Sequence, residues 1–417
     1  MTNAYNYGIV ITTKEIKLVM KGLNELKMNV YLNSCSTTQP TKEVIDDVNF
    51  YLKQNWSNPS DISQDGVHAK GDITNARNQI AKAIGADWNE IFFTSSGSES
   101  NNWAIKGVVD AYFDCRTTII TTMIEHPSVY NTCKYLESKG YRVKYLPVDH
   151  FGFINISELD EILKSTRMSN KDVPLVSIMF ANNEIGTIQP IKKIAEIVHK
   201  HNGILHVDAV QAFMHTHINV KELGIDLMTA SGHKVNCPKG IGFLYKKKDV
   251  KITPLIHGGK QEFEMRGGTE NVPYICAMGN QVERLSDDLD IYIERATDLR
   301  NYIIKEVYEK CGEYCAVYLN GHPRQRIVNN LSFTFEGVNA EQIITLLDIK
   351  GIQVSAGSAC CSGEKTPSRV LKAMGYSDKE TFSTIRVSFD YNTTRDMVDN
   401  FVDALVECIR SLQMFVD

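Results

Sequence analysis

The feature that most constrains the fold of this sequence is a regular alternation of short β-rich runs and longer helical patterns between about residues 75 and 245. The helical segment 190–203, for example, keeps its isoleucines, an alanine and a valine on one face and ends at a glycine. Alternating strands and helices need crossover connections, which predict a mostly parallel sheet with helices on both faces. The predicted strands are 90–96, 116–126, 141–148, 174–182, 203–210, 226–231 and 240–247.

The pattern changes after about residue 290 and predicts a smaller α+β domain. A long charged helix at 286–312 comes first. It is followed by a strand at 328–337, a helix at 340–351, a strand at 384–390 and a helix at 395–412. A chain of 417 residues is long enough for a large domain and such a smaller one.

Composition and charge exclude several classes of protein. The formal net charge is −5, which gives no indication of nucleic-acid binding or of an acidic membrane surface. There is no run of about 18 apolar residues that would span a membrane, and the charged first 27 residues lack a signal-peptide core. We therefore expect a cytoplasmic protein whose ten scattered cysteines are reduced. Cys311 and Cys315 lie four positions apart and are interpreted as ordinary residues, so no metal site is predicted.

Chemically reactive residues fall where predicted strands end, which is where ligands bind in open parallel sheets. The run GILHVDAVQA places Asp208 at the tip of a buried strand, where an acid needs a cation or a strong donor. It is either a structural cap or a carboxylate that keeps a heteroaromatic ring nitrogen protonated. In the second case Gln211 could reach a neighbouring ring substituent.

Two further segments suit a cofactor but have simpler explanations. In TSSGSESNNWAIKG, Gly97 and Ser98 begin a predicted helix whose free backbone N–H groups suit a phosphate, although a plain helix cap explains the pattern equally well. In IEHPSVYN, His126 precedes a proline and is held extended, so its ring could stack on a ligand or carry protons. It could equally be a core histidine.

The loop SAGSACCSGEKTPS, residues 355–368, contains Cys360 among glycines and serines. Such a loop is predicted to be exposed and mobile, and an exposed thiol without a disulfide partner is a candidate nucleophile or an idle surface cysteine. The segment TASGHKVNCPKG places Lys234 in a tight frame after His233. A strand-end acid, a strand-end amine and a helix start that suits phosphate together describe a pyridoxal phosphate (PLP) site, to which Ser231 could add a phosphate donor.

At this point the chain resembles the NifS/IscS-type cysteine desulfurases, which are class-V aminotransferases among the fold-type-I PLP-dependent enzymes. The resemblance runs from about Val30 to the C-terminus. The motifs that carry it are YLNSCSTTQP, SNPS, FTSSGSESNNWAIKG, IEHPSV, ANNEIGTIQPI, HVDAVQA, SGHKVNCPKGIGFLY, MRGGTEN, NGHPRQRIVNNLSFTF, SAGSACCSG and the segment around Arg386.

The resemblance implies an α/β fold-type-I architecture, with a seven-stranded, mostly parallel sheet in a large domain. It implies a large PLP-binding domain at 43–289 and a small domain made of 28–42 and 290–417 that carries the Cys360 loop, with 1–27 as an extension. It also implies a homodimer with its active site at the subunit interface. The short spacing from Cys360 to Pro367 is similar to that of the subgroup that hands sulfur to partner proteins.

The resemblance also implies roles for single residues. Lys234 matches the lysine that binds the cofactor aldehyde and abstracts the substrate α-proton, and Cys360 matches the thiol that takes sulfur from L-cysteine and leaves L-alanine. His126 would stack on the ring and move protons, Asp208 would pair with the ring nitrogen, and Gln211 would bond the phenolic oxygen. The implied phosphate ligands are Gly97, Ser98, Ser231, His233 and, from the partner subunit, Thr269. The implied residues for the substrate carboxylate are Asn183, which is also implied to contact the cofactor, and Arg386, whose guanidinium binds carboxylates bidentately.

Several positions depart from the family pattern. Asn33 and Ser34, followed by Cys35, replace an Asp-Asn pair, and Cys237 replaces a glycine of positive φ, where we expect strain. The other departures are Ser63, Phe263, Glu264 and the additional thiol Cys361. They leave two alternatives to a desulfurase that feeds iron–sulfur cluster assembly or thiolation. One is a selenocysteine lyase or a cysteine/cystine C–S lyase; the other is a catalytically silent scaffold.

Overall fold

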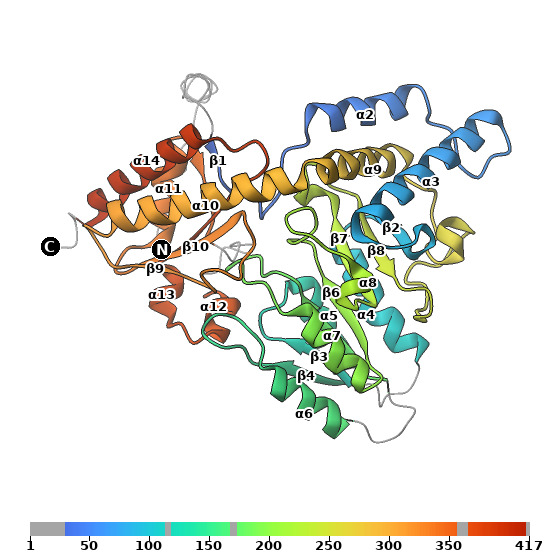
Figure 1. The fold of residues 1–417 in the computed structure, drawn as a ribbon, viewed down its shortest axis with the longest axis horizontal. Helices are drawn as coiled ribbons and strands as arrows, with labels where there is room; N and C mark the ends of the chain where they lie inside the picture. Colours follow the sequence, from blue (N-terminus) through green and yellow to red (C-terminus); the bar gives the residue numbers. More distant parts are fainter. Residues whose placement is uncertain (1–29, 113–117, 167–172, 357–365, 414–417) are drawn as a thin grey trace, which may run out of the picture.

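A computed structural model describes residues 30–112, 118–166, 173–356 and 366–413 of the chain. Its largest sheet has seven strands in the order β2-β8-β7-β6-β5-β3-β4 (Figure 1). Only β8 runs against its neighbours among these seven strands, so the sheet is mostly parallel as predicted. The strands are β2 (Ile91–Thr94), β3 (Thr118–Thr122), β4 (Arg142–Leu146), β5 (Leu175–Met179), β6 (Ile204–Asp208), β7 (Leu227–Ser231) and β8 (Gly242–Lys246).

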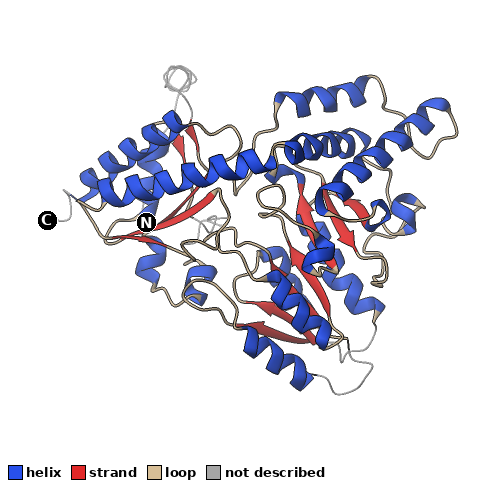
Figure 2. Cartoon of the chain, in the orientation of Figure 1, coloured by secondary structure: helices blue, strands red, loops and turns tan. Residues whose placement is uncertain are grey.

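Helices cover both faces of this sheet (Figure 2). Because neighbouring strand residues point to opposite faces, Ile120 and Val176 join one core with α3, α7 and α9, whereas Ile119 and Leu175 join the other with α4 and α5. The helices of this part are α2 (Lys42–Lys53), α3 (Gln64–Ile84), α4 (Gly97–Ala111), α5 (Pro127–Ser138), α6 (Ile156–Thr166), α7 (Ile191–Lys200), α8 (Val220–Leu223) and α9 (Val272–Asp287), with short 3₁₀ turns η1 (Trp88–Glu90), η2 (Gly232–Lys234) and η3 (Gln261–Glu264).

The C-terminal part has its own core, which also takes in Val30 and Leu32 from the start of the described chain. It contains an antiparallel sheet of order β12-β10-β9 and a parallel pair of β1 and β11. Its elements are β1 (Val30–Tyr31), α10 (Leu289–Cys311), β9 (Val317–Leu319), β10 (Asn330–Phe335), α11 (Ala340–Ile349), β11 (Ile352–Gln353), α12 (Arg369–Ala373), α13 (Asp378–Phe382), β12 (Thr384–Ser388) and α14 (Arg395–Gln413).

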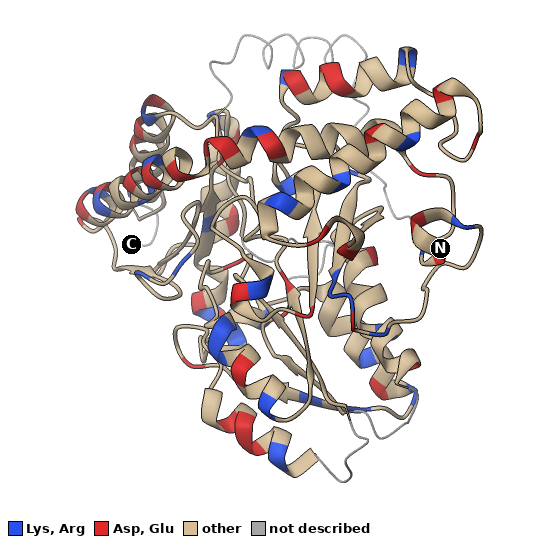
Figure 3. Cartoon of the chain, turned by 45° about the vertical axis from the view of Figure 1, so that its right-hand side comes forward, with Lys and Arg blue, Asp and Glu red and all other residues tan. Residues whose placement is uncertain are grey.

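Each of the seven predicted β-rich runs contains one strand, although every strand is shorter than its run. The predicted helix at 286–312 is wrong in one respect, because Asp288 separates α9 from α10. The domain boundaries stay a prediction, and residues 1–27 lie outside the described residues. Acidic and basic residues are interspersed along the helices (Figure 3). None of the described helices combines the length and apolar character that a bilayer crossing requires.

Candidate functional site

The reactive residues meet at the edge of the sheet where the parallel strands end. Strand β6 ends at Asp208, and β7 ends at Ser231 and leads directly into the turn that holds Lys234. The chain after β3 reaches His126, and the chain after β5 reaches Asn183. Since carboxyl ends of parallel strands share one edge, the topology brings together side chains that are far apart in the sequence.

Lys234 is held by the backbone of an N-terminal segment. Its Nζ donates to the carbonyl oxygens of Cys35 and Ser36, each at 2.6 Å. Burial lowers the pKa of Lys234 to about 8, and the charge of Arg386 acts in the same direction while Asp208 opposes it. The amine therefore gives up its proton far more readily than an exposed lysine does, which suits a nucleophile or a general base.

Asp208 is a buried carboxylate with neutral partners. It is 5% exposed and accepts from the Asn101 Nδ2 at 2.7 Å and from the backbone N of Val210 at 3.0 Å. Within the described part of the chain no ion pair matches its charge, although a buried carboxylate is stabilised by a cationic partner. A protonated ring nitrogen at this edge would provide that partner.

The N-terminus of α4 lies against the ends of β6 and β7. A Cβ at Gly97 would come within 2.7 Å of the Val210 Cγ2 and 3.5 Å of the Ser231 Cβ, so a larger residue does not fit without a shift. The predicted cap is confirmed, because the Ser96 hydroxyl accepts from the backbone N of Glu99. The cap leaves the first amides of α4 for a ligand, so a phosphate at this helix start is compatible with it.

Two histidines line the same edge. His126 is the N-cap of α5 in an extended conformation, and its Nδ1 accepts from the backbone N of Ser128 at 3.2 Å. The neutral ring therefore carries its proton on Nε2. Although part of the residue is exposed, desolvation by the surrounding protein lowers the pKa of His126, against the attraction of Asp208. The His233 Nδ1 lies 3.2 Å from the Thr37 Oγ1, and burial lowers the pKa of His233 to about 4.

Arg386 reaches the site from the C-terminal part of the chain. It lies on β12, is 4% exposed, and donates to the Asn183 carbonyl oxygen and the Asn33 Oδ1, both at 3.0 Å. The structure therefore places both residues expected to bind the substrate carboxylate at one point. Asn33, one of the departures from the family pattern, holds this guanidinium directly.

Cys35 has a larger part in the site than sequence reasoning gave it. Its carbonyl oxygen accepts from the Gln211 Nε2 at 3.1 Å as well as from Lys234, and its Sγ accepts from the Asn330 Nδ2 at 3.2 Å. The sequence indicated only that Cys35 departs from the family pattern. No local signal announces these contacts, because the partners follow it by between 176 and 295 positions.

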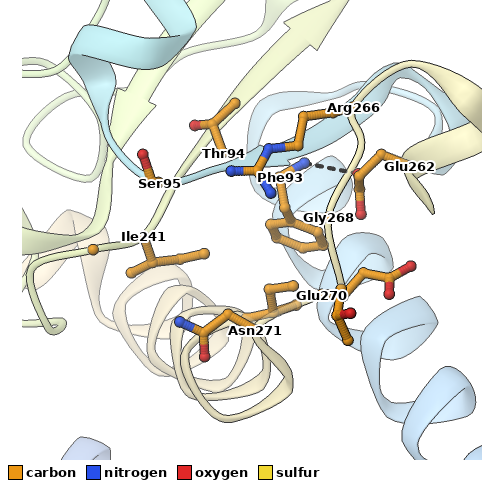
Figure 4. Close-up of a pocket in the computed structure, with 12 residues that line it drawn as sticks. Phe93, Thr94, Ser95, Ile241, Glu262, Arg266, Gly268, Glu270 and Asn271 are labelled. Atoms are coloured by element: carbon orange, nitrogen blue, oxygen red, sulfur yellow. Dashed lines mark hydrogen bonds between the residues drawn. The ribbon is translucent and has the colours of Figure 1, made fainter. Parts of the chain in front are cut away.

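Thr269 lines a cavity of about 140 Å³ beside the start of α4, together with Thr94 and Ser95 of the same chain (Figure 4). Arg266 lines the same cavity, and its Nε donates to the Glu99 Oε1 at 2.9 Å, which ties this loop to α4. The contribution of Thr269 to a partner subunit's site stays a prediction.

The prediction that Cys237 takes up a strained, positive φ is wrong, because the neighbouring residue has this conformation instead. The positive φ of 59° belongs to Asn236, a residue type that tolerates this conformation, and Cys237 is buried next to it. The departures Phe263 and Glu264 do lie in left-handed backbone, with φ of 58° and 66°, after Glu262 at 46°. Three consecutive left-handed residues without a glycine mark this turn as strained.

Cys360 and Cys361 lie outside the described residues, so the structure says nothing of them. In the described ranges, no group of three or more histidine, cysteine or acidic side chains is arranged to hold a metal ion. Ser63, another departure from the family pattern, is the N-cap of α3 and accepts from the backbone N of Gly66.

Comparison with known proteins places this geometry in a family. Residues 30–401 match the aminotransferase class-V family. The chain is 43% identical to cysteine desulfurase IscS of Dictyoglomus turgidum over 388 residues, which cover 93% of this chain and 96% of that protein. It is also 43% identical to the Methanosarcina thermophila protein of the same name over 384 residues, which cover 92% and 93%.

Solved structures agree with this placement. A NifS-like protein superposes with a TM-score of 0.84 at 34% identity, over 92% of this chain and all of that one. SspA in complex with cysteine superposes with a TM-score of 0.75 at 33% identity, over 86% and 98%. The predicted fold class is thereby confirmed, and the chain belongs to the class-V aminotransferase family, among its cysteine desulfurases.

Proposed function

We propose that this protein is a PLP-dependent cysteine desulfurase that converts L-cysteine to L-alanine and takes up the sulfur as a persulfide on Cys360. The observation that carries the proposal is that one sheet edge holds both the Lys234 amine, whose pKa is lowered, and the buried carboxylate of Asp208. The class-V relatives named as cysteine desulfurases, which match over nearly their whole length, support it.

The residues at this edge fit PLP. Asp208 would hold the ring nitrogen, since its present hydrogen-bond donors are neutral. Gly97 and Ser98 at the start of α4, with Ser231 and His233, would hold the phosphate. When bound, PLP supplies an aldehyde that takes up an amine and a ring that withdraws electrons from the substrate α-carbon.

The other side chains at the site then have defined tasks. Lys234 would hold the cofactor covalently and afterwards take the α-proton, for which its lowered pKa suits it. His126 would stack on the ring and carry protons, and Gln211, whose Nε2 now donates to the Cys35 carbonyl, would turn to the phenolic oxygen. Arg386 and Asn183 would hold the substrate carboxylate.

The sulfur transfer needs no reactant other than the Cys360 thiolate, the bound L-cysteine and a proton. The Cys360 thiolate attacks the sulfur of the bound L-cysteine, an S–S bond forms, and the C–S bond breaks. The carbon keeps the electron pair and gains a proton, which gives L-alanine, and Cys360 keeps the extra sulfur. Cysteine suits this step because its thiolate is a strong nucleophile.

The proposal extends to assembly and partners. We propose a homodimer in which Thr269 of one chain reaches the phosphate bound by the other. The persulfide would pass to an acceptor or scaffold protein for iron–sulfur cluster assembly or thiolation. The cytoplasmic location stays a prediction.

Mass spectrometry of the PLP-loaded protein after incubation with L-cysteine tests this function. We expect one added sulfur atom on the peptide that contains Cys360 and one alanine released with it. Cys360→Ser should carry no added sulfur there, and the neighbouring Cys361→Ser is the matched control that should keep it. Release of pyruvate and ammonia in place of alanine, with no sulfur-bearing cysteine, would refute the desulfurase and favour a β-eliminating C–S lyase. Rates on cystine and selenocysteine would then identify its substrate.

A further inference from the structure

We propose that Arg369 is a positioning residue that clamps α12 to the start of α5 and fixes the orientation and electrostatic surroundings of His126. The inference rests on the proposed function, in which His126 stacks on the cofactor and carries protons. Arg369 itself lies in the C-terminal part of the chain, whereas His126 belongs to the seven-stranded part.

The clamp consists first of two hydrogen bonds to the loop that leads into α5. The Arg369 guanidinium donates through Nη1 to the carbonyl oxygen of Met123 and through Nη2 to that of Glu125. The Glu125 carbonyl belongs to the peptide bond that joins Glu125 to His126. Arg369 therefore fixes the plane of the peptide from which the His126 side chain projects.

A third contact holds the same guanidinium on the other side of His126. Its central carbon lies 4.0 Å from the centroid of the Tyr130 ring, in the first turn of α5. The residues before and after His126 are thus held by one planar group. An ammonium could not do this, because only the guanidinium fork donates in two directions while its face stacks on a ring.

The neighbouring residue and a small apolar core reinforce the clamp. The Ser368 hydroxyl donates to the Glu184 Oε2 at 2.6 Å, and Glu184 follows Asn183, whose carbonyl accepts from Arg386. Val370 and Leu371 of α12 share a buried cluster with Ile124 of the β3–α5 connection, Met179 at the end of β5 and Ile185 of the β5–α7 connection. The position of α12 is therefore well determined relative to the residues expected to handle the substrate.

The charge of Arg369 also acts on His126, in addition to the contacts that hold α12. A cation at the N-terminus of α5 gains nothing from the helix dipole, which favours anions there. The charge of Arg369 instead acts on the pKa of His126, which it lowers together with Lys234, while desolvation is the largest cause and Asp208 opposes. The other titratable groups that face Arg369 are Glu125, Glu184, Tyr130 and Tyr145.

The buried acids beside Arg369 ionise less readily than exposed acids, so they cancel less of its charge. Burial raises the pKa of Glu125 to about 8 and raises the pKa of Glu184 as well, so both acids hold their protons more tightly than exposed ones. Tyrosines are neutral in this range. Removing the guanidinium should therefore raise the pKa of His126.

Two variants of Arg369 separate its charge from its geometry. In the PLP-loaded enzyme, Arg369→Met should move the acidic limb of the pH profile of kcat/KM upward by about half a unit, the size expected for one charge in a partly solvated site. Arg369→Lys should leave that limb near its wild-type position. Both should lower kcat on the order of tenfold, because the ring loses its fixed position.

A matched control and a readout independent of turnover complete the test. Arg395→Met removes another arginine that stacks on a tyrosine, Tyr302, on the outer helices of the C-terminal part, and should leave the profile unchanged. NMR titration of ring-labelled histidine, with His126 assigned by His126→Gln, should show its pKa raised in Arg369→Met and not in Arg369→Lys.

The outcomes distinguish this inference from the proposed function. If the wild type releases no alanine, the proposed function fails, and the NMR titration alone decides on Arg369. An unshifted His126 pKa in Arg369→Met overturns the inference even if activity falls, because loss of activity alone would show only a structural role. A wild-type kcat in both Arg369 variants overturns the clamp.

Discussion

The buried pair of Arg77 and Glu262 gives the most demanding prediction for stability. The two side chains are 5% and 3% exposed. Glu262 accepts from the Arg77 Nη1 at 2.8 Å and Nη2 at 2.7 Å, and from the backbone N of Phe93 at 2.8 Å. The guanidinium also lies between the rings of Phe93 and Phe263. The pair fixes the left-handed turn 262–264 to the edge of the sheet.

Glu262→Gln keeps the shape of the side chain but removes its charge and puts an NH2 donor where one of the two carboxylate oxygens accepts from Arg77. A broken buried ion pair of this kind costs about 3–5 kcal/mol. For a folding unit the size of the seven-stranded part, that loss corresponds to a fall in Tm of roughly 10 °C. Thermal unfolding of the PLP-free protein, followed by circular dichroism, measures it without interference from the cofactor.

Two companion variants control the measurement. Asp46→Asn removes the acid of a surface pair with Lys42 and should change Tm by no more than about 1 °C. Arg77→Met combined with Glu262→Gln should recover part of the loss, because no unpaired charge then remains buried. A Tm for Glu262→Gln within about 2 °C of the wild type would refute the reasoning that this pair holds the turn.

Three further predictions concern the site. Lys234→Ala should retain no cofactor on the polypeptide after borohydride reduction and should release no alanine, which peptide mapping and amino-acid analysis check. Gly97→Ala brings a Cβ within 2.7 Å of Val210. The shift of α4 should raise the dissociation constant for PLP about tenfold, and overpacking should cost the PLP-free protein about 1–3 kcal/mol of stability; an unchanged dissociation constant would contradict a phosphate site at the start of α4. Burial raises the pKa of Glu125 from 4.5 to about 8, so the folded state keeps a proton that the unfolded chain releases, and stability should fall as pH rises through this window. Glu125→Gln should remove that slope, as scans at about pH 5 and about pH 8 would show.

Sequence reasoning predicted the large sheet well because strand and helix periodicity are local signals. The end of β6 at Asp208 and the turn at Lys234 both follow from apolar runs that stop at a polar residue. The topological rule for parallel sheets then brings these ends together. The break at Asp288 was missed, because α9 and α10 are both charged amphipathic helices and neither glycine nor proline separates them.

The missing parts of the site are contacts between distant segments. Asn101 holds Asp208 across 107 positions, and Arg369 reaches the Glu125 carbonyl across 244. Neither side chain is distinctive where it occurs, since one lies within a helix and the other begins a short one. Their contacts with Asp208 and Glu125 arise only in the folded protein, where α12 packs on the β3–α5 connection.

The short segment after β1 has a consequence for the order of events during synthesis. Its backbone pairs with Gln353, Ser388 and His233, and Asn33 holds Arg386. Translation adds about 5–20 residues per second, so Arg386 follows Lys234 out of the ribosome with a delay on the order of ten seconds. Strand β1 must wait for β11, and the segment after it must wait for β12, so the contacts around Lys234 are complete only after residue 388 has been synthesised.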